Sequence, residues 1–453
     1  MKPAWNLLVL LALLVGIRLA VAWLYPLVPD EAYYWCWAQR PDWGYFDHPP
    51  MIAWIIWLST HLAGNSGFGV RLLPVLLSGA TALPAYLLVR DLSDDSRALN
   101  SVLAGAGALL LGAGSVLAVM DVPLLFFISL GLLAGVRALG KGWWWLVFGI
   151  ALGGALLSKY TGAFLLLVPV SYLFTAPKTF RSIYPWAGLG IACLVIAPNV
   201  FWLARHDWVS LFFQASHGLG RGFSPLGPLR FLAEAVLLSS GPLALVLGWG
   251  AIRAFVIDRK PGIIALSAFT WLTLLFFAGM SLRGHGEANW PAPAYLSLVI
   301  LGTVGWPSIR NWPWRVSLAI GLALVALVYA HAAFPFLPLR SDPTAQARGW
   351  KELARCVERA RAEHPGLPLA TARYQEASEL RFYMPDHPEI VVVNPPHRPS
   401  HFNLWYPEDS LVGHDFLYIG EPPEGCFQTV EKVFACTGPR PYNIFLVRGF
   451  GSR

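Results

Sequence analysis

Apolar residues in this chain fall in long runs that short polar segments separate. A run of about twenty apolar residues, rising about 1.5 Å per residue, is long enough to cross the hydrocarbon core of a bilayer as a helix. The pattern therefore predicts a polytopic α-helical membrane protein of about 11 spans. The predicted spans are 4–25, 68–90, 98–119, 122–139, 143–157, 160–176, 183–204, 230–252, 262–280, 291–309 and 314–334.

Basic residues occur in alternate loops between these spans. When Lys2 is placed in the cytoplasm, Arg90, Lys141 and Lys260 all fall on the inner side. Positively charged inner loops are what membrane insertion favours, so the pattern supports this orientation. The chemistry is then expected on the outer side, where the polar segments are 26–67, 120–121, 158–162, 205–229, 281–289 and everything after 335.

The composition agrees with a lipid environment. Of the 453 residues, 56% are hydrophobic and only 13% are charged, where a soluble domain carries about a quarter charged residues. The formal net charge of +7 is spread over short loops and forms no basic stripe. Nucleic acid is therefore excluded as the partner, and membrane lipids are the expected surroundings.

The composition becomes charged and proline-rich towards the C-terminus. We expect a transmembrane catalytic domain over 1–338 and a small extracytoplasmic α/β domain over 339–453. Apolar residues at helical spacing predict a helix over 344–363 in the second domain. Short apolar runs at 390–393 and 415–419 predict strands.

The first outer loop, 26–67, is the most informative segment. Pro29 and the Pro49–Pro50 pair interrupt it, and tryptophans suited to the membrane interface recur along it. We expect two juxtamembrane helices between 30 and 63 that lie along the outer membrane surface and form one wall of the site. A crossing here would instead move every later basic loop outside.

Ionisable side chains cluster in this loop, namely Asp30, Glu31, Asp47 and His48. Asp30 follows a proline and precedes a helix-favouring run, so it is also suited to cap that helix. Ionisable groups near membrane depth are costly and tend to be functional, so the cluster predicts a site. The alternative is a set of unrelated caps and interface anchors.

Three further outer segments carry polar residues. Asp121 lies between two spans, with Pro123 opening the second, which also suits an N-cap. Lys159 separates two apolar runs, where a cation needs an anionic partner. We expect Asp30 and Asp121 to face one outward cavity. The last segment contributes Arg283, His285, Glu287 and Asn289.

Carboxylates beside cations at a membrane surface suit the transfer of a sugar from a lipid phosphate. A carboxylate takes the proton of the acceptor, while Lys, Arg or His neutralises the departing phosphate. This scheme requires no metal, and no metal-ligand spacing or nucleotide-binding fingerprint occurs. We expect no cofactor, with a divalent metal left open.

Five cysteines are present, three of them in the C-terminal domain. Cys426 and Cys436 are spaced so that a disulfide would close a short loop in an oxidising outer compartment. A free pair is the alternative, because spacing does not fix geometry.

Several short motifs occur between residues 1 and 300. They are Asp30-Glu31, Asp47-His-Pro-Pro50, Phe68-Gly-Val-Arg-Leu72, Met120-Asp-Val-Pro123, Ser158-Lys-Tyr-Thr-Gly162 and Gly286-Glu-Ala-Asn-Trp-Pro291. Together they resemble the GT-C membrane glycosyltransferases, in particular the bacterial branch of the protein O-mannosyltransferase and lipid A aminoarabinose transferase family (glycosyltransferase family 39-like). Segments 374–383 and 402–405 also resemble stretches common in its bacterial members.

The resemblance implies an inverting glycosyltransferase that moves a sugar from a polyprenyl-phosphate donor to an extracytoplasmic acceptor. The acceptor is lipid A or lipopolysaccharide, another glycan or a protein. The implied location is a bacterial inner membrane, with the site and the C-terminal domain on the periplasmic side.

The resemblance also assigns roles by position. Asp30 is the base or acceptor-orienting group, Glu31 its neighbour and Asp121 the second acid. The aminoarabinose transferases have Arg where this chain has Tyr33 and Lys where it has His48, which weakens an assignment to that sugar. Donor phosphate candidates are Lys159, His48, Arg71 and Arg283, and substrate-binding candidates are Asp47, Tyr33, Tyr160, His285, Glu287 and Asn289.

Two other functions are compatible with a polytopic chain. A transporter or flippase would place charges along a midplane pathway and show an internal repeat. Here the charges gather outside, and no repeat is evident. A glycan ligase with a lipid-diphosphate donor would share the fold, and only a donor assay separates it from the monophosphate enzyme.

Overall fold

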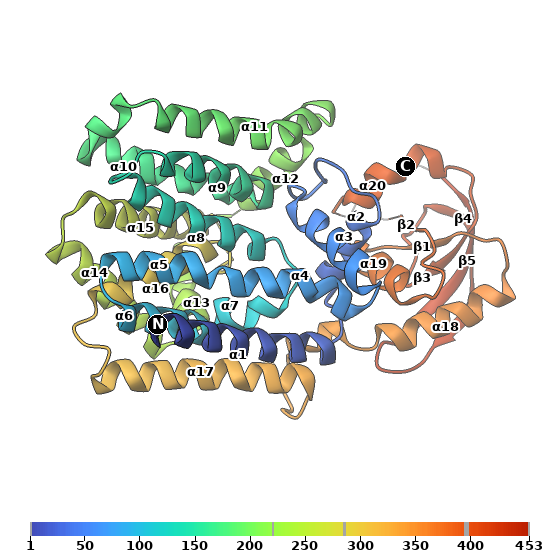
Figure 1. Ribbon diagram of the computed structural model, residues 1–453. Helices are drawn as coiled ribbons and strands as arrows, with labels where there is room; N and C mark the ends of the chain where they lie inside the picture. The colour runs from blue at the N-terminus through green and yellow to red at the C-terminus, as the bar shows by residue number, and fades with distance from the viewer. Residues whose placement is uncertain (1, 220–221, 284–286, 394–397, 452–453) are drawn as a thin grey trace. The chain divides into compact units, whose positions relative to one another are not determined.

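The computed structural model describes residues 2–219, 222–283, 287–393 and 398–451 (Figure 1). The chain forms two compact units, and each contains two separate stretches of sequence. The first unit comprises Met1–Leu24 and His48–Phe336, and the second comprises Tyr25–Asp47 and Leu337–Arg453. The division differs from the expected domain boundaries in one respect. Residues 25–47 of the first outer loop belong to the unit that holds the C-terminal part of the chain.

The first unit is helical (Figure 1). Its helices are α1 (Lys2–Leu24), α3 (Met51–Ala63), α4 (Gly67–Ala80), α5 (Ala82–Leu92), α6 (Asp95–Gly107), α7 (Leu109–Ala113), α8 (Asp121–Ala138), α9 (Trp144–Ser158), α10 (Leu167–Thr175), α11 (Tyr184–Arg205), α12 (Val209–Leu219), α13 (Gly227–Leu238), α14 (Pro242–Ile257), α15 (Pro261–Ser281), α16 (Ala292–Gly305) and α17 (Trp312–Ala333). Short 3₁₀ turns are η1 (Gly114–Val116), η2 (Tyr160–Leu166) and η3 (Pro177–Arg181).

Six of the described helices are long and apolar enough to cross a membrane, or up to eight if each of two bent pairs is one span. Each of the other three expected spans coincides with a shorter apolar helical segment, at Trp144–Ser158, Tyr160–Thr175 and Ala292–Gly305. The helical membrane fold is therefore confirmed, while the count of about 11 crossings stays a prediction.

Apolar side chains lie on both the inside and the outside of this unit. Leu132, Phe269 and Ile300 are in its buried core. Phe174 and Leu194 are 83% and 75% exposed, which is the pattern of helices whose solvent is lipid. Small residues allow close helix packing between α9 and α11. A Cβ added at Gly149 would lie 2.0 Å from the carbonyl oxygen of Gly188.

Two helices of the unit are broken, and a side chain at one break binds backbone groups at the other. α6 bends by 80° into α7, and α13 bends by 104° into α14. Ser240 at the second break donates a hydrogen bond to the Gly107 carbonyl at 2.7 Å. Its hydroxyl also accepts from the Leu109 N–H at 3.0 Å. Because backbone groups freed inside a membrane have no water to bind, this serine supplies the partners that the first break needs.

The second unit is built on a five-stranded mixed sheet in the order β2-β1-β3-β5-β4. β1 is parallel to β2 and β3, while β5 is antiparallel to β3 and β4. Strands β2 and β3 and helix α18 lie within the ranges expected from the sequence. The elements are α2 (Pro29–Ala38), α18 (Trp350–Glu363), β1 (Leu369–Thr371), α19 (Tyr374–Tyr383), β2 (Ile390–Val392), α20 (His401–Trp405), β3 (Phe416–Ile419), β4 (Phe427–Cys436) and β5 (Tyr442–Phe450), with 3₁₀ turns η4 (Ala345–Ala347) and η5 (Glu408–Leu411).

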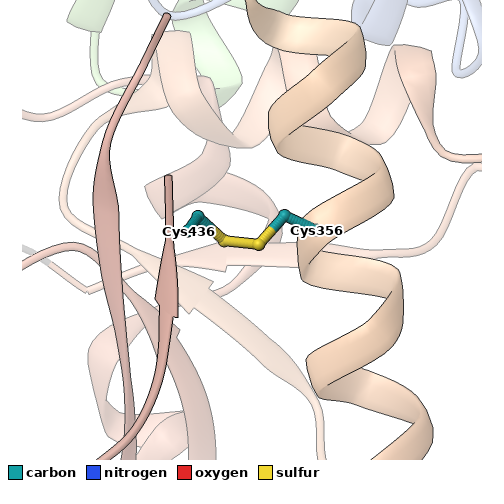
Figure 2. Close-up of a disulfide and its surroundings, with 2 residues drawn as sticks. All are labelled: Cys356 and Cys436. Atoms are coloured by element: carbon teal, nitrogen blue, oxygen red, sulfur yellow. A yellow bond between two sulfur atoms is a disulfide. The ribbon is translucent and has the colours of Figure 1, made fainter. Parts of the chain in front are cut away.

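The disulfide in this unit joins two cysteines that are far apart in sequence. Cys356 on α18 is bonded to Cys436 at the end of β4, across 80 residues of sequence (Figure 2). Cys426 is buried and free. Cys426 and Cys436 are therefore neither bonded to each other nor both free, because the helix, which is distant in sequence, packs against the sheet beside Cys436.

The first outer loop contains the two expected helices, α2 and α3, but they belong to different units. α2 packs against α19. The chain entering α2 is tied to the same unit, because the Leu27 N–H donates to the Tyr383 hydroxyl at 3.3 Å and the Tyr25 hydroxyl donates to the Thr344 carbonyl at 3.2 Å. The position of α2 and α3 along the membrane surface stays a prediction.

Candidate active site

The acidic pair at the start of α2 divides into two roles. Glu31 is fully buried, and its carboxylate accepts from the Val28 N–H at 3.0 Å. Glu31 therefore caps the helix, which binds a backbone N–H that would otherwise lack a partner. Asp30 is exposed and accepts from the Tyr374 hydroxyl at 3.3 Å. The interpretation of Asp30 as the helix cap is wrong, since the N-cap is Val28.

Asp47 is the buried acid of the second unit. It is 2% exposed and binds a different group through each carboxylate oxygen. The Tyr33 hydroxyl donates to one at 2.6 Å, and the Arg398 guanidinium donates to the other at 2.9 Å. Burial leaves little of this carboxylate open to a substrate, and its two contacts hold Tyr33 and Arg398 in place.

Burial is the largest influence on the pKa values of Asp47 and Tyr33. It raises the pKa of Asp47 to about 6, although Arg398 and the hydrogen bond from Tyr33 act in the opposite direction. Burial and the Asp47 charge together raise the pKa of Tyr33 well above its usual range. Tyr33 is thus a phenol that donates to Asp47. It also accepts from the His401 N–H at 2.7 Å.

Aromatic rings enclose this hydrogen-bonded group. The Tyr33 ring centroid is 4.4 Å from that of Tyr374 and 5.9 Å from that of Phe402. The Arg398 guanidinium lies 5.4 Å from the centre of the Tyr374 ring, within the range of a cation–π contact. His401 Nδ1 accepts from the Phe46 N–H at 3.0 Å. The loop before α3 is therefore fastened to α20.

Tyr374, Arg398 and His401 were not predicted as site residues. Of these three, only Tyr374 lies in a segment, 374–383, that resembles a stretch common in the bacterial members of the family. Their polar side chains meet residues 30–47 across more than 300 positions of sequence, and no local spacing reports such a contact.

Asp121 and Lys159 form an ion pair in the first unit. The ammonium nitrogen of Lys159 lies 2.9 Å from an oxygen of Asp121, and the two side chains are 12% and 24% exposed. Asp121 begins α8, whose N-cap is Met120, so the interpretation of Asp121 as an N-cap is wrong. Lys159 does have the anionic partner that its position requires, and that partner is a protein carboxylate.

Two further candidates of the first unit lie beside α12. The Tyr160 hydroxyl faces Asn199 on α11 and Ser210 on α12. His48 Nδ1 is 3.3 Å from the side-chain nitrogen of Gln214, also on α12. Ser210 and Gln214 are four residues apart and so share one face of that helix. Gln214, Asn199 and Ser210 were not predicted from the sequence.

The remaining candidates are Arg71, Arg283, His285, Glu287 and Asn289. Arg71 is fully buried, and its guanidinium donates to the Ala22 carbonyl at 3.4 Å. A phosphate would have to compete with the backbone of α1 for it. Arg283 and Glu287 are exposed and Asn289 is half-buried. His285 lies outside the described residues.

A protein metal site needs several ligating side chains close together. Within residues 2–219, 222–283, 287–393 and 398–451, no group of three or more His, Cys, Asp or Glu residues is arranged to hold an ion. The expectation that the chain needs no cofactor stays a prediction.

The first unit is helical and contains an acid–lysine pair, and the second contains one exposed and one buried aspartate. In sequence and in fold the chain is similar to the GT-C membrane glycosyltransferases. The family described as dolichyl-phosphate-mannose-protein mannosyltransferase matches residues 47–202. The predicted resemblance to this family is therefore confirmed, and the chain is an enzyme of the glycosyltransferase class.

Individual relatives agree with this assignment. The chain is 28% identical to the lipid A galacturonosyltransferase RgtD of Rhizobium johnstonii, over 76% of this chain and 72% of that protein. It is also 28% identical to the undecaprenyl phosphate-alpha-4-amino-4-deoxy-L-arabinose arabinosyl transferase of Pseudomonas aeruginosa, over 65% of this chain. It spans 56% of that second relative's length.

The solved structures show the fold. ArnT from Cupriavidus metallidurans bound to undecaprenyl phosphate superimposes with a TM-score of 0.69 at 17% identity, covering 98% of both chains. Its apo form gives a TM-score of 0.66 with the same coverage.

Proposed function

We propose that the chain transfers a sugar from a polyprenyl-phosphate donor to a lipid A or lipopolysaccharide acceptor, with inversion at the sugar carbon. The family assignment supports glycosyl transfer. The names of its relatives support the donor and acceptor, because they describe a lipid A galacturonosyltransferase and arabinosyl transferases that use an undecaprenyl phosphate sugar. Another glycan or a protein remains an alternative acceptor.

The observation that carries the proposal is the exposure of Asp30. Four acids lie in the first outer loop. Glu31 and Asp47 are buried with structural partners, and Asp42 is half-buried. Asp30 is the exposed one. An acid that contacts an incoming acceptor has to be accessible and oriented, and Asp30 meets both conditions.

The proposed reaction is a single displacement. An acceptor oxygen attacks the anomeric carbon, a new carbon–oxygen bond forms, and the bond from that carbon to the donor phosphate breaks. Asp30 takes the proton of a hydroxyl acceptor, or orients an acceptor that is already ionised. One displacement inverts the configuration, and free polyprenyl phosphate leaves with the electron pair of the broken bond.

Lys159 is the proposed partner of the departing phosphate. Its ammonium group has three N–H donors, so it can keep the contact with Asp121 while it donates to a phosphate oxygen. The low exposure of both side chains strengthens such contacts, because water competes poorly for them. Asp121 in this proposal holds Lys159 in the orientation that the phosphate requires.

The proposed location is a bacterial inner membrane with the C-terminal segment on the periplasmic side. Basic residues in alternate loops support this orientation. The Cys356–Cys436 disulfide supports it independently, because such bonds persist in oxidising compartments.

A donor assay tests the proposed function. The purified full chain, in lipid nanodiscs with lipid A, is given a polyprenyl-monophosphate sugar or the matching polyprenyl-diphosphate sugar. We expect labelled lipid A and free polyprenyl phosphate from the monophosphate donor alone. Turnover of the diphosphate donor alone would make the chain a ligase. Movement of intact donor across the bilayer without sugar transfer would make it a flippase.

A further inference from the structure

A base on an exposed side chain has a positional problem. Asp30 stands in the first turn of α2 with its side chain open to solvent, and a side chain that samples several rotamers loses entropy each time it is aligned for a reaction. α19 supplies a group that restricts it. The Tyr374 hydroxyl donates to one Asp30 oxygen at 3.3 Å.

Tyr374 is itself held from two neighbours. Its ring packs against Tyr33 at a centroid distance of 4.4 Å. The guanidinium of Arg398 lies 5.4 Å from the same ring. A cation over an aromatic face and a ring against a ring both restrict how the phenol can turn.

Both of those neighbours depend on one buried carboxylate. Asp47 accepts from the Tyr33 hydroxyl at 2.6 Å and from Arg398 at 2.9 Å. Asp47 is 2% exposed, so solvent competes little for either contact. Asp47 is the fixed point from which Tyr33 and Arg398 position the Tyr374 ring.

We propose that Tyr374 is a positioning residue for Asp30, and that Asp47, Tyr33 and Arg398 hold it in place. The inference rests on the proposed role of Asp30 in glycosyl transfer. It adds that the C-terminal part of the chain takes part in the reaction, although Tyr374 lies outside residues 47–202 matched by the mannosyltransferase family.

The proton needed for this hydrogen bond stays on the phenol. Burial, with a contribution from the Asp30 charge, raises the pKa of Tyr374. Tyr374 therefore donates to the carboxylate at neutral pH and does not compete with it as a base.

The test compares Tyr374→Phe with Tyr383→Phe. Both changes remove one hydroxyl from α19, and Tyr383 accepts from the Leu27 N–H at 3.3 Å, just before α2. Tyr383→Phe therefore reports the cost of loosening α2 without touching Asp30. We expect Tyr374→Phe to lower kcat roughly tenfold with an unchanged KM for the polyprenyl-phosphate sugar, because alignment and not binding is lost. Tyr383→Phe should keep kcat within about twofold.

A second comparison asks whether Tyr374 acts through Asp30. Adding Tyr374→Phe to Asp30→Asn should leave the residual kcat unchanged, because the group that it positions is already gone. A double variant that is a further tenfold slower would overturn the proposal, as would equal losses in Tyr374→Phe and Tyr383→Phe. Absence of turnover in the wild type would contradict the proposed function instead.

Thermal unfolding tests the contact without any turnover. The midpoints of wild type, Asp30→Ala, Tyr374→Phe and the variant with both changes form a cycle. Ala is used here because the side-chain oxygen of Asn could still accept the hydrogen bond from Tyr374. We expect the two single shifts not to add, since each breaks the same hydrogen bond. Additive shifts would overturn the proposal even in an inactive preparation.

Discussion

Asp47 gives a prediction in which two opposing effects can be compared. Burial raises the pKa of its carboxyl from 3.8 to about 6, while the nearby Arg398 cation favours the ionised form. The folded chain therefore holds the proton up to a higher pH than the unfolded chain does. Between about pH 4 and pH 6 the folded state binds more protons, so stability falls as pH rises through this window.

The size of the effect follows from the difference between the two pKa values. A rise from 3.8 to about 6 corresponds to roughly 3 kcal/mol of stability that is present below pH 4 and lost by pH 6. For the second unit, which contains Asp47, this free energy corresponds to a shift of about 10 °C in the thermal midpoint. Asp47→Asn carries no proton in this range and so lacks this contribution.

The assay is thermal unfolding of the full chain in detergent, followed by tryptophan fluorescence from pH 4 to pH 7. The midpoint of wild type minus that of Asp47→Asn should fall by about 10 °C over this range, while all other titrating groups cancel in the difference. A difference that rises with pH would mean that the attraction of Arg398 exceeds the cost of burial. A flat difference would mean that the two effects balance.

Three further changes test other contacts. Lys159→Ala should slow donor turnover at least about tenfold, and Lys159→Arg should recover part of it because phosphate accepts either cation; an unchanged rate in Lys159→Ala would remove the residue from the site. Ser240→Ala should destabilise the chain by about 1–3 kcal/mol in a denaturation assay, because it leaves the Gly107 carbonyl and the Leu109 N–H without their partner; unaltered stability would show that the helix break finds other partners. Dialysis against a chelator should leave transfer unchanged, since Lys159 supplies the positive charge for the phosphate, and loss of activity that a divalent metal restores would contradict this.

Hydropathy and charge predicted the helical membrane unit well, because both act locally along the chain. The same local signals did not predict the helix breaks. The run predicted as one span over 98–119 bends between α6 and α7, and the group that makes this bend tolerable is Ser240, in a different helix. A window of sequence does not contain such a partner.

The contacts of the candidate site also depend on residues that are distant in sequence. Asp30 and Glu31 are adjacent and chemically alike, so spacing could not tell which one faces solvent and which one caps α2. Lys159 was expected to need an anionic partner, and the chain supplies Asp121 from 38 positions away. Tyr374 and Arg398 could not be paired with Asp30 and Asp47 from the sequence, because residues 25–47 join a unit formed by the end of the chain.

The central claim is that the exposed carboxylate of Asp30 acts on the acceptor. Its most direct test is the rate of sugar transfer by Asp30→Asn from a polyprenyl-monophosphate donor, measured against Asp42→Asn, a matched change in the same loop whose carboxylate accepts from the adjacent Trp43 N–H at 2.7 Å. Loss of a general base typically costs about 10²–10⁴ in rate. We expect a loss of at least about 100-fold in Asp30→Asn, with a normal thermal midpoint because Glu31 still caps α2, and near wild-type transfer by Asp42→Asn. Wild-type transfer by Asp30→Asn would contradict the account.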